Sequence, residues 1–246
     1  MNKGPVLFSE IGKKAKDLLT RDYSYDQKFS VSTYSNLGVG LTSTVVEKGG
    51  LSNADIAAQY KYRNINFDVK VDTESKLEAQ YSHEHATFTT IVALKQSPVV
   101  DLTGTVGTPT FALGAEAGYD TSSGCFTKYN AGLIMTKQHS TASVIIGDKG
   151  DTLTASFVHD ANHLRSAGVA EVIRRFSDNE NTVTVGASYG FDHHTTLKAR
   201  LNNHGQLAAL LQHQLQPKSL LTVSGEFDTK GLDKTPKIGV SLALKP

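Results

Sequence analysis

Histidine supplies the pattern in this chain that comes nearest to a metal site. His83-Glu84-His85 spaces two imidazoles two residues apart, which places both on one face of a strand, where they could ligate a metal ion. Zinc sites in proteins use three or four protein ligands, and no third ligand accompanies this pair. His193-His194 straddles a predicted turn, and we interpret it as a solvated pair. The sequence therefore predicts no metal site.

Catalytic motifs are also missing from the sequence. The one cysteine, Cys125, excludes an intrachain disulfide framework and a cysteine-based zinc site. We interpret it as a small residue beside a turn, and not as a nucleophile. The chain contains no GxSxG, P-loop, HExxH or dinucleotide motif. We expect no enzymatic activity and no cofactor.

Basic side chains form the pattern that could act on ions. The totals are nearly balanced, with 25 Lys plus Arg against 24 Asp plus Glu and a net charge of +1, so the whole chain has no electrostatic bias toward nucleic acid. The distribution is more informative than the total. One group lies in the first segment: Lys13, Lys14, Lys16 and Arg21. A second group lies on polar strand faces, and it comprises Lys28, Lys61, Lys70, Lys198 and Arg200, partly offset by Asp68, Glu78, Asp101, Glu116 and Glu226.

The first segment has helical periodicity. Between residues 5 and 20 the apolar residues recur at spacings of three and four, and Pro5 suits the first turn of a helix. They are Leu7, Phe8, Ile11, Ala15, Leu18 and Leu19. We predict one amphipathic helix over 5–20. From this segment alone, packing on a soluble core is an equally good interpretation.

The remainder of the chain alternates with a period of two. In 182–190, for example, Val183, Val185 and Tyr189 share one face, while polar and small residues share the other. Turn residues such as Asp148-Lys149-Gly150 separate the runs. We predict 17 antiparallel strands, near 27–35, 38–47, 54–63, 65–73, 76–85, 87–95, 98–106, 109–119, 126–137, 139–147, 151–159, 166–176, 181–191, 194–203, 206–215, 218–228 and 236–245.

The apolar faces of these strands point to a membrane. Mean hydropathy is −0.26 and no stretch reaches the roughly 20 apolar residues of a spanning helix, but a spanning strand needs only about ten residues, half of them apolar. The chain has no Trp, and its apolar faces are rich in Ala, Val and Gly, which could not fill the wide interior of a closed sheet of this size. We therefore predict a transmembrane barrel whose apolar face meets lipid and whose polar face lines water. Tyrosines predicted near strand ends fit an interfacial girdle: Tyr60, Tyr62, Tyr81, Tyr119, Tyr129 and Tyr189.

Targeting information is expected to be internal. The N-terminal segment has neither a secretory apolar core with a cleavage site nor an Arg- and Ser-rich presequence.

Three segments carry a family resemblance. Lys3-Gly4-Pro5 followed by residues 10–19, EIGKKAKDLL, is similar to the N-terminal helix of the plant voltage-dependent anion channels, the mitochondrial porins. Tyr189-Gly190-Phe191-Asp192, Thr195 and the stretch 199–203 resemble the eukaryotic porin signature, with His193 as a departure that we expect to alter only a turn. The tail from 217 to 246 is similar to the plant members almost throughout. The resemblance covers essentially the whole chain.

The resemblance also indicates a missing piece. Mitochondrial porins have 19 strands, two more than the 17 predicted here. The relatives have extra chain after the segment that matches 67–75, enough for about one hairpin, so we expect this chain to be a short form that lacks a hairpin between Ser75 and Lys76. Loss of two strands keeps the strand count odd, so the first and last strands could still pair in parallel.

The resemblance implies a fold, a function and a location. It implies an all-β fold, a transmembrane antiparallel β-barrel of about 17 strands with the amphipathic helix in or near the lumen, divided into 1–25 (helix and hinge) and 26–246 (barrel). It implies a voltage-gated, weakly anion-selective channel that passes ions and small metabolites, including adenine nucleotides, across the mitochondrial outer membrane, as opposed to the plastid outer membrane. Homo-oligomers and partners of the hexokinase type are implied as well, and no nucleic-acid specificity.

The same resemblance assigns roles to residues. Lumen selectivity is expected from Lys13, Lys14, Lys16, Arg21, Lys61, Lys70, Lys198 and Arg200. Helix docking is expected from Leu7 and Ile11. The last strand carries Lys237, Gly239, Leu242 and Leu244, which resemble the sorting signal of mitochondrial outer-membrane barrels.

Three alternatives remain open on the sequence. The short form could conduct poorly and act mainly through partner binding. The chain could be a soluble β-barrel carrier with an inward apolar cavity. Within the membrane-barrel class, it could be a related mitochondrial barrel for protein import, although the N-terminal and signature matches favour the porins.

Overall fold

A single 17-stranded sheet makes up most of the chain. The computed structural model describes the backbone of residues 4–21, 23, 27–34, 39–48, 51–62, 65–71, 76–93, 98–161, 166–216, 219–230 and 237–244, and their side chains except in 27–34, 39–48, 51–62, 65–71, 76, 78, 82, 216, 243 and 244. The strands are β1 Gln27–Tyr34, β2 Val39–Lys48, β3 Leu51–Tyr62, β4 Ile65–Val71, β5 Lys76–Ser82, β6 Ala86–Ala93, β7 Val99–Gly107, β8 Phe111–Asp120, β9 Cys125–Lys137, β10 Ser140–Gly147, β11 Thr152–Asp160, β12 Ala167–Arg175, β13 Glu180–Gly190, β14 Thr195–Asn202, β15 Gln206–Gln216, β16 Ser219–Asp228 and β17 Lys237–Leu244. Three short helical segments are η1 Phe8–Glu10, α1 Lys13–Leu19 and η2 Asp148–Gly150.

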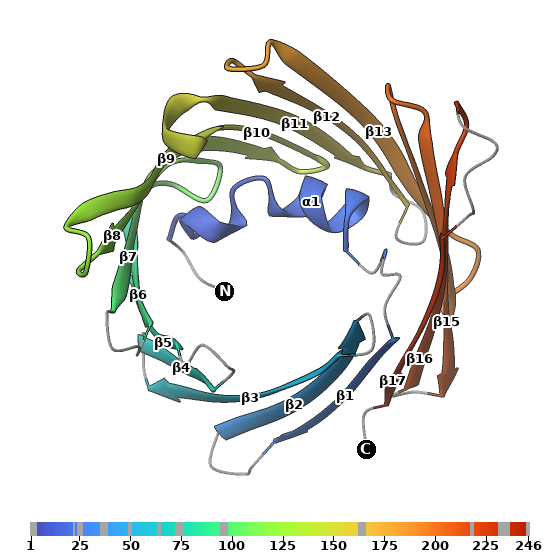
Figure 1. The fold of residues 1–246 in the computed structure, drawn as a ribbon, viewed down its shortest axis with the longest axis horizontal. Helices are drawn as coiled ribbons and strands as arrows, with labels where there is room; N and C mark the ends of the chain where they lie inside the picture. The colour runs from blue at the N-terminus through green and yellow to red at the C-terminus, as the bar shows by residue number, and fades with distance from the viewer. Residues whose placement is uncertain are drawn as a thin grey trace.

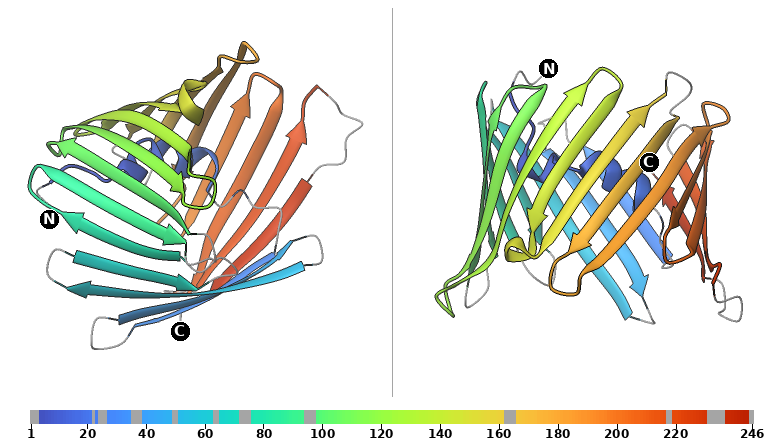
Figure 2. Two further views of the ribbon diagram at one scale, coloured as in Figure 1. Left: turned by 60° about the vertical axis from the view of Figure 1, so that its left-hand side comes forward. Right: turned by 90° about the horizontal axis from the view of Figure 1, so that it is seen from above.

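The strands close into a ring. Each strand from β1 to β17 pairs antiparallel with the next one. The seam between β1 and β17 is parallel, with Phe29 opposite Leu242 and Ser30 opposite Ala243. Figure 1 shows the ring end-on, and Figure 2 shows its strands inclined to the common axis. The predicted fold and the predicted number of strands are confirmed.

Strand parity defines two rims. Turns that follow odd-numbered strands lie on one rim, which we call the odd rim, and turns that follow even-numbered strands lie on the other, the even rim. The turn between β4 and β5 belongs to the even rim, and these strands pair directly from Ile65 opposite Tyr81 to Lys70 opposite Lys76. The expected deletion point after Ser75 falls in this connection, and residues 72–75 lie outside the described residues.

The N-terminal segment differs from the single helix expected over 5–20. It forms η1, then a break, and then the seven residues of α1. Gly12 adopts φ +74° at the break, a left-handed conformation that a side chain disfavours. Its Cα also lies close to the wall, because a Cβ there would come within 3.1 Å of Ile145 Cδ1. The apolar periodicity was therefore informative about the buried face but not about the interruption.

The helical segments lie inside the ring (Figure 1). η1 packs on β7 and β8, and α1 packs on β11 to β14. Counting strands around the ring, the β4–β5 junction lies opposite the strands that hold α1. No helix among the described residues is long and apolar enough to cross a membrane.

Candidate functional site

Apolar side chains cover the outer face of the ring. On β13, Val183, Val185 and Tyr189 are 40–56% exposed, whereas Ser188 on the inner face is 6% exposed. The same alternation recurs on β17, where Ile238 and Val240 are exposed. A broad exposed apolar surface of this kind fits lipid and not water. The soluble-carrier alternative required the opposite orientation, and it is not supported.

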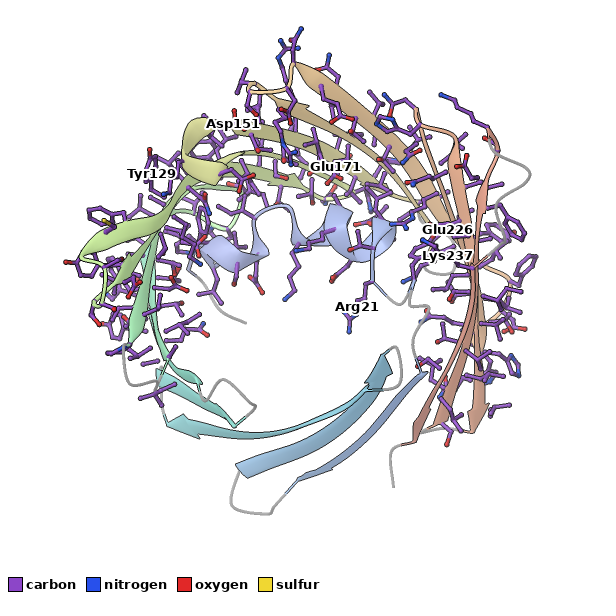
Figure 3. The ribbon with its side chains drawn as sticks, viewed as in Figure 1. Arg21, Tyr129, Asp151, Glu171, Glu226 and Lys237 are labelled. Carbon is purple, nitrogen blue, oxygen red and sulfur yellow. The ribbon has the colours of Figure 1, made fainter. Side chains whose placement is uncertain are left out.

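Aromatic residues gather near both ends of the strands on this outer face. Toward the odd rim they are Tyr81, Phe88, Phe111, Phe157, Tyr189 and Phe191. Toward the even rim they are Tyr119, Phe126, Tyr129, Phe176 and Phe227. Tyr129 points away from the ring in Figure 3. Two belts of this kind match the two interfaces of a bilayer. The side chains of Tyr60 and Tyr62 lie outside the described residues.

The N-terminal half of the helical segment docks on β8 and β9. Phe8 and Ile11 are 8% and 4% exposed and form a buried cluster with Ala112 and Ile134. Leu7, which the sequence paired with Ile11 as a docking residue, is half-buried, and the partly buried residues that pack against this cluster are Val6 and Ile145. Phe8 is a contact that sequence reasoning did not single out, although it belongs to the predicted apolar face.

The C-terminal half docks on β11 and β12. Ala15 and Leu19 are 1% and 2% exposed and pack with Val158 and Val169. The wall comes very close at Gly186 on β13, where an added Cβ would lie 2.7 Å from Leu19 Cδ2. Small inner-face residues therefore let the helical segments lie directly on the strands.

Arg200 holds the C-terminal end of α1. Its Nη1 donates a hydrogen bond of 2.6 Å to the carbonyl oxygen of Leu19, and its Nη2 donates one of 3.1 Å to Glu226 Oε2. Its guanidinium also lies over the ring of Tyr23, 4.7 Å from the centroid. The last carbonyls of a helix lack partners within the helix and carry partial negative charge, so a cation there satisfies and stabilises them. The sequence placed Arg200 in the lumen but did not predict this contact.

The basic residues of the helical segment are open to the lumen, although two of them also lie near carboxylates of the wall. Lys13, Lys14, Lys16 and Arg21 are all exposed. Lys14 pairs with Asp160 at 3.4 Å. Arg21 pairs with Asp17 at 3.4 Å and points toward the middle of the ring in Figure 3.

Carboxylates on the inner face lie close to cations of the wall or of the helical segment. Lys128 on β9 pairs with Asp101 at 3.1 Å and also contacts Glu116, which accepts a hydrogen bond of 3.0 Å from Asn130. Glu171 on β12 faces α1, with Lys16 as its charged neighbour (Figure 3).

Another carboxylate, Glu226, is shared by two cations of the wall. It is reached by Lys237 at 3.7 Å as well as by Arg200, and Figure 3 shows Glu226 and Lys237 on the inner side of the sheet.

Lys128 was not among the predicted site residues. Its pairing depends on the register of three strands, which periodicity does not specify.

The remaining predicted site residues lie on strands, and the structure describes the side chains of only some of them. Lys198 lies on β14 two residues before Arg200, and therefore on the same face, and it takes part in further interactions. The side chains of Lys61 and Lys70, and those of Lys28, Asp68 and Glu78, lie outside the described residues. Lys237, Gly239, Leu242 and Leu244 all lie on β17, where Gly239 is buried and the side chain of Leu244 is not described.

The two histidine pairs lie in turns. β5 ends at Ser82, so His83-Glu84-His85 is not the strand pair that the sequence suggested. A hydrogen bond of 2.8 Å from His83 N to Ala86 O closes this turn. His193 and His194 lie in the turn after β13, as predicted. Within the described part of the chain, no group of three or more His, Cys, Asp or Glu is placed to hold a metal ion.

Known proteins resemble this chain along its length. The family model for Eukaryotic porin matches residues 4–79 and 73–239. Mitochondrial outer membrane protein porin 2 of Arabidopsis thaliana is 55% identical over 276 positions, which cover 100% of each chain. Mitochondrial outer membrane protein porin 5 of Oryza sativa subsp. japonica is 53% identical over 274 positions, which cover 99% of each chain.

Alignment lengths bear on the missing hairpin. The alignment to porin 2 of Arabidopsis has 276 positions against the 246 residues of this chain, a difference of 30. The two family matches overlap at 73–79, which covers most of the β4–β5 connection and the start of β5. Another relative, Putative mitochondrial outer membrane protein porin 5 of Arabidopsis thaliana, is 50% identical over 254 positions that cover 100% of each chain, so it is nearly as short. The overlap of the two family matches is consistent with a local shortening, and one relative has a similar total length.

Proposed function

Because this chain belongs to the eukaryotic porin family and forms a channel for small solutes in the mitochondrial outer membrane, we propose that it is voltage-gated, weakly anion-selective and permeable to adenine nucleotides. The observation that carries the proposal is the exposed basic surface of the helical segment inside the ring. The family is one of channels and not of enzymes.

The balance of exposed charge favours anions. On the helical segment, Lys13, Lys14, Lys16 and Arg21 outnumber Glu10 and Asp17. Ion pairs between exposed side chains stabilise by at most about 1 kcal/mol, so the pairs of Lys14 and Arg21 leave their charges available to solutes.

The wall carboxylates offset this positive charge less than their number suggests. Glu116 and Glu226 are 16% and 14% exposed, and wall cations contact both. A permeating phosphate group would meet basic side chains that can form charge-assisted hydrogen bonds to it.

Voltage gating is the part of the proposal that depends on charge movement. Moving one elementary charge through 100 mV changes the free energy by about 2.3 kcal/mol, so a helical segment with several cations would respond to a potential if its docking contacts loosened. We place the gating charge on this segment because it carries the basic cluster and because side-chain contacts join it to the wall.

Two further roles belong to the proposal. We propose that β17 carries the sorting signal, through Lys237, Gly239, Leu242 and Leu244. Replacing Leu242 with Gln should then reduce insertion of the radiolabelled protein into isolated mitochondria. Homo-oligomers and hexokinase-type partners, which the family resemblance implies, would show as crosslinked species in native outer membranes.

Planar-bilayer recording tests the proposal. The purified protein, folded in detergent and added to a bilayer, should give stepwise conductance that falls at high potential of either sign. A salt gradient should give a reversal potential of the sign set by anions. A folded protein that inserts and gives no conductance would overturn the proposal and favour a partner-binding short form.

A further inference from the structure

Histidines are concentrated on one rim of the barrel. The chain has nine, and those placed by the described residues on the odd rim are His83, His85, His139, His159, His193, His194 and His213. Among the described residues, only His204 lies on the even rim, in the turn after β14. His163 lies outside the described residues. The asymmetry suggests that one membrane interface, and not both, contacts imidazoles.

Two of these histidines repeat one arrangement. His159 near the end of β11 is the register partner of Ser140, and its Nδ1 lies 3.0 Å from Ser140 Oγ. His213 on β15 is the register partner of Thr195, and its Nδ1 lies 3.0 Å from Thr195 Oγ1. In each case the hydroxyl belongs to the first residue of the preceding strand. Nδ1 is therefore occupied in both rings, and within the described residues neither Nε2 has a hydrogen-bond partner.

Both rings belong to the lipid-facing side. On β11, Val158 is buried against α1, so His159 faces outward with Phe157, which is 50% exposed. On β15, His213 lies between Leu211 and Leu215, which are 43% and 53% exposed. Both histidines are exposed near the odd rim, at the end of the apolar band. This is the depth at which lipid headgroups meet a barrel.

Space is available next to His159. Its register partner on β12 is Gly168, and a Cβ added to Gly168 would meet nothing within 4 Å. Gly168 is in turn the register partner of Ala187 on β13. Small residues on two neighbouring strands therefore leave room for a bulky headgroup beside the imidazole.

The charged groups around the two histidines differ. Asp160 follows His159 but pairs with Lys14 on the inner side, and the register partners Ser140 and Gly168 are uncharged. The nearest other titratable groups are His139, whose carbonyl accepts from the Asp160 amide, and Lys137, the register partner of Ser140 on β9. Near His213, Thr195 Oγ1 also donates to Asp192 Oδ2 at 3.4 Å, and Asp192 accepts from the backbone N–H of His194. On β16, the register partner of His213 is Leu221, which is uncharged.

This arrangement determines which ring nitrogen of His213 donates and which accepts a hydrogen bond. If Thr195 donates to Asp192, it accepts from Nδ1–H of His213. Nε2 of the neutral ring is then an acceptor, and it becomes a donor only when the ring is protonated.

We propose that His159 and His213 each bind the phosphate group of a separate anionic glycerophospholipid at the odd rim, since they lie four strands apart, and that they do so in their protonated form. Histidine changes charge between about pH 5 and 8, and a protonated imidazole donates a charge-assisted hydrogen bond to phosphate. A lipid fits better than a free anion because both rings face outward beside exposed apolar side chains, which an acyl chain would cover. Binding strengthens as pH falls, and it is confined to one leaflet. The site lies outside the lumen and is independent of the proposed selectivity.

Native mass spectrometry of the full-length, detergent-folded protein with a short-chain phosphatidylinositol tests the inference. At about pH 5.5 the wild type should retain the lipid several-fold better than at about pH 8. His159→Gln combined with His213→Gln should abolish this difference and leave conductance in bilayers unchanged, which shows that the variant is folded. Phosphatidylcholine of the same chain length should show little pH dependence in any variant.

His204→Gln is the matched control. His204 also contacts a hydroxyl, Thr182 Oγ1 at 3.3 Å, but it lies on the even rim and pairs with Glu180 at 3.5 Å. This variant should keep the pH dependence of the wild type. The inference is overturned if the double variant keeps that dependence, or if His204→Gln loses it equally. It is also overturned if inorganic phosphate at a concentration matched to the lipid displaces it fully, because the site would then recognise free phosphate.

Discussion

Arg200 Nη1 donates a 2.6 Å hydrogen bond to the carbonyl oxygen of Leu19, so a strand of the wall caps the C-terminal end of the helix inside the ring. The two residues are 181 positions apart in the chain. Glu226 holds the other side of the guanidinium at 3.1 Å. The same cation therefore joins the helix to β14 and to β16, and much of its charge is used in doing so.

Replacing Arg200 should release α1 from the wall. A hydrogen bond from a charged group stabilises by about 1.5–3 kcal/mol, so Arg200→Gln should shift the docking equilibrium by about tenfold or more. Trypsin cuts after the exposed lysines of α1, and cleavage there should accelerate accordingly. Arg174→Gln is the control, because Arg174 bonds to Asn179 and Asn181 at the even rim. Equal cleavage rates in both variants would count against the anchoring role.

A larger side chain at Gly186, beneath Leu19, should also displace the helix. An added Cβ at Gly186 would lie 2.7 Å from Leu19 Cδ2 and 3.1 Å from the backbone oxygen of Ala199. Gly186→Val should therefore destabilise docking by about 1–3 kcal/mol, as overpacking generally does.

The control for this substitution is Gly168→Ala, where an added Cβ has open space. Trypsin cleavage of α1 should accelerate in Gly186→Val alone. Acceleration in both variants, or in neither, would refute close approach at Gly186 as the cause.

The shorter barrel should conduct less than its longer relatives. Barrel diameter scales about linearly with strand number, so 17 strands in place of 19 give a ring about a tenth narrower and about a fifth smaller in cross-section. The helix occupies the same area in both, so the open area falls by a larger fraction. Single-channel conductance should be at least about a fifth below that of Arabidopsis porin 2 in the same salt. Equal conductance would contradict the closure through β1 and β17.

The stability of the turn after β13 should depend on pH through Asp192. A backbone hydrogen bond from His194 holds the pKa of this carboxyl below its usual range, and further hydrogen bonds from the Thr195 backbone and hydroxyl act in the same direction. A lowered pKa means that the carboxylate stabilises the turn above the usual Asp pKa of about 3.9, and that this stabilisation is lost as pH falls below it.

Hydrogen exchange at the His194 and Thr195 amides, relative to their intrinsic rates, measures the effect. Protection should fall below about pH 4 in the wild type and be independent of pH in Asp192→Asn. As a control, the Ser122 amide, which donates to Asp120 Oδ1 in another turn, should behave alike in both proteins. Unchanged protection of His194 in the wild type at low pH would disprove the role of Asp192.

The sequence was most informative where one physical rule acts alone. Alternation located every strand because the lipid-facing side chains must be apolar at every second position, as at Val183 and Val185. It did not locate the break at Gly12, because glycine at that position is compatible with a continuous helix until the wall beside Ile145 is known.

Contacts between side chains on different strands were the hardest to predict from the sequence. Lys128 meets Asp101 and Glu116 only because of the register between β7, β8 and β9, and Arg200 meets Leu19 only because the ring closes around the helix. Neither contact has a local signal. The sequence therefore predicted which residues are polar and inward, but not which of their charges are used up in pairing.

The central claim is that the cations of the docked helix set the ion preference, and one measurement tests it most directly. The reversal potential across a planar bilayer with a salt gradient should favour anions in the wild type. It should move toward cation preference when Lys13→Glu and Lys16→Glu are combined, because both side chains are exposed on the helix inside the ring. Lys149→Glu, in the exposed η2 turn of the even rim, should leave it almost unchanged. A double variant that keeps the reversal potential of the wild type, while still conducting, would contradict the claim.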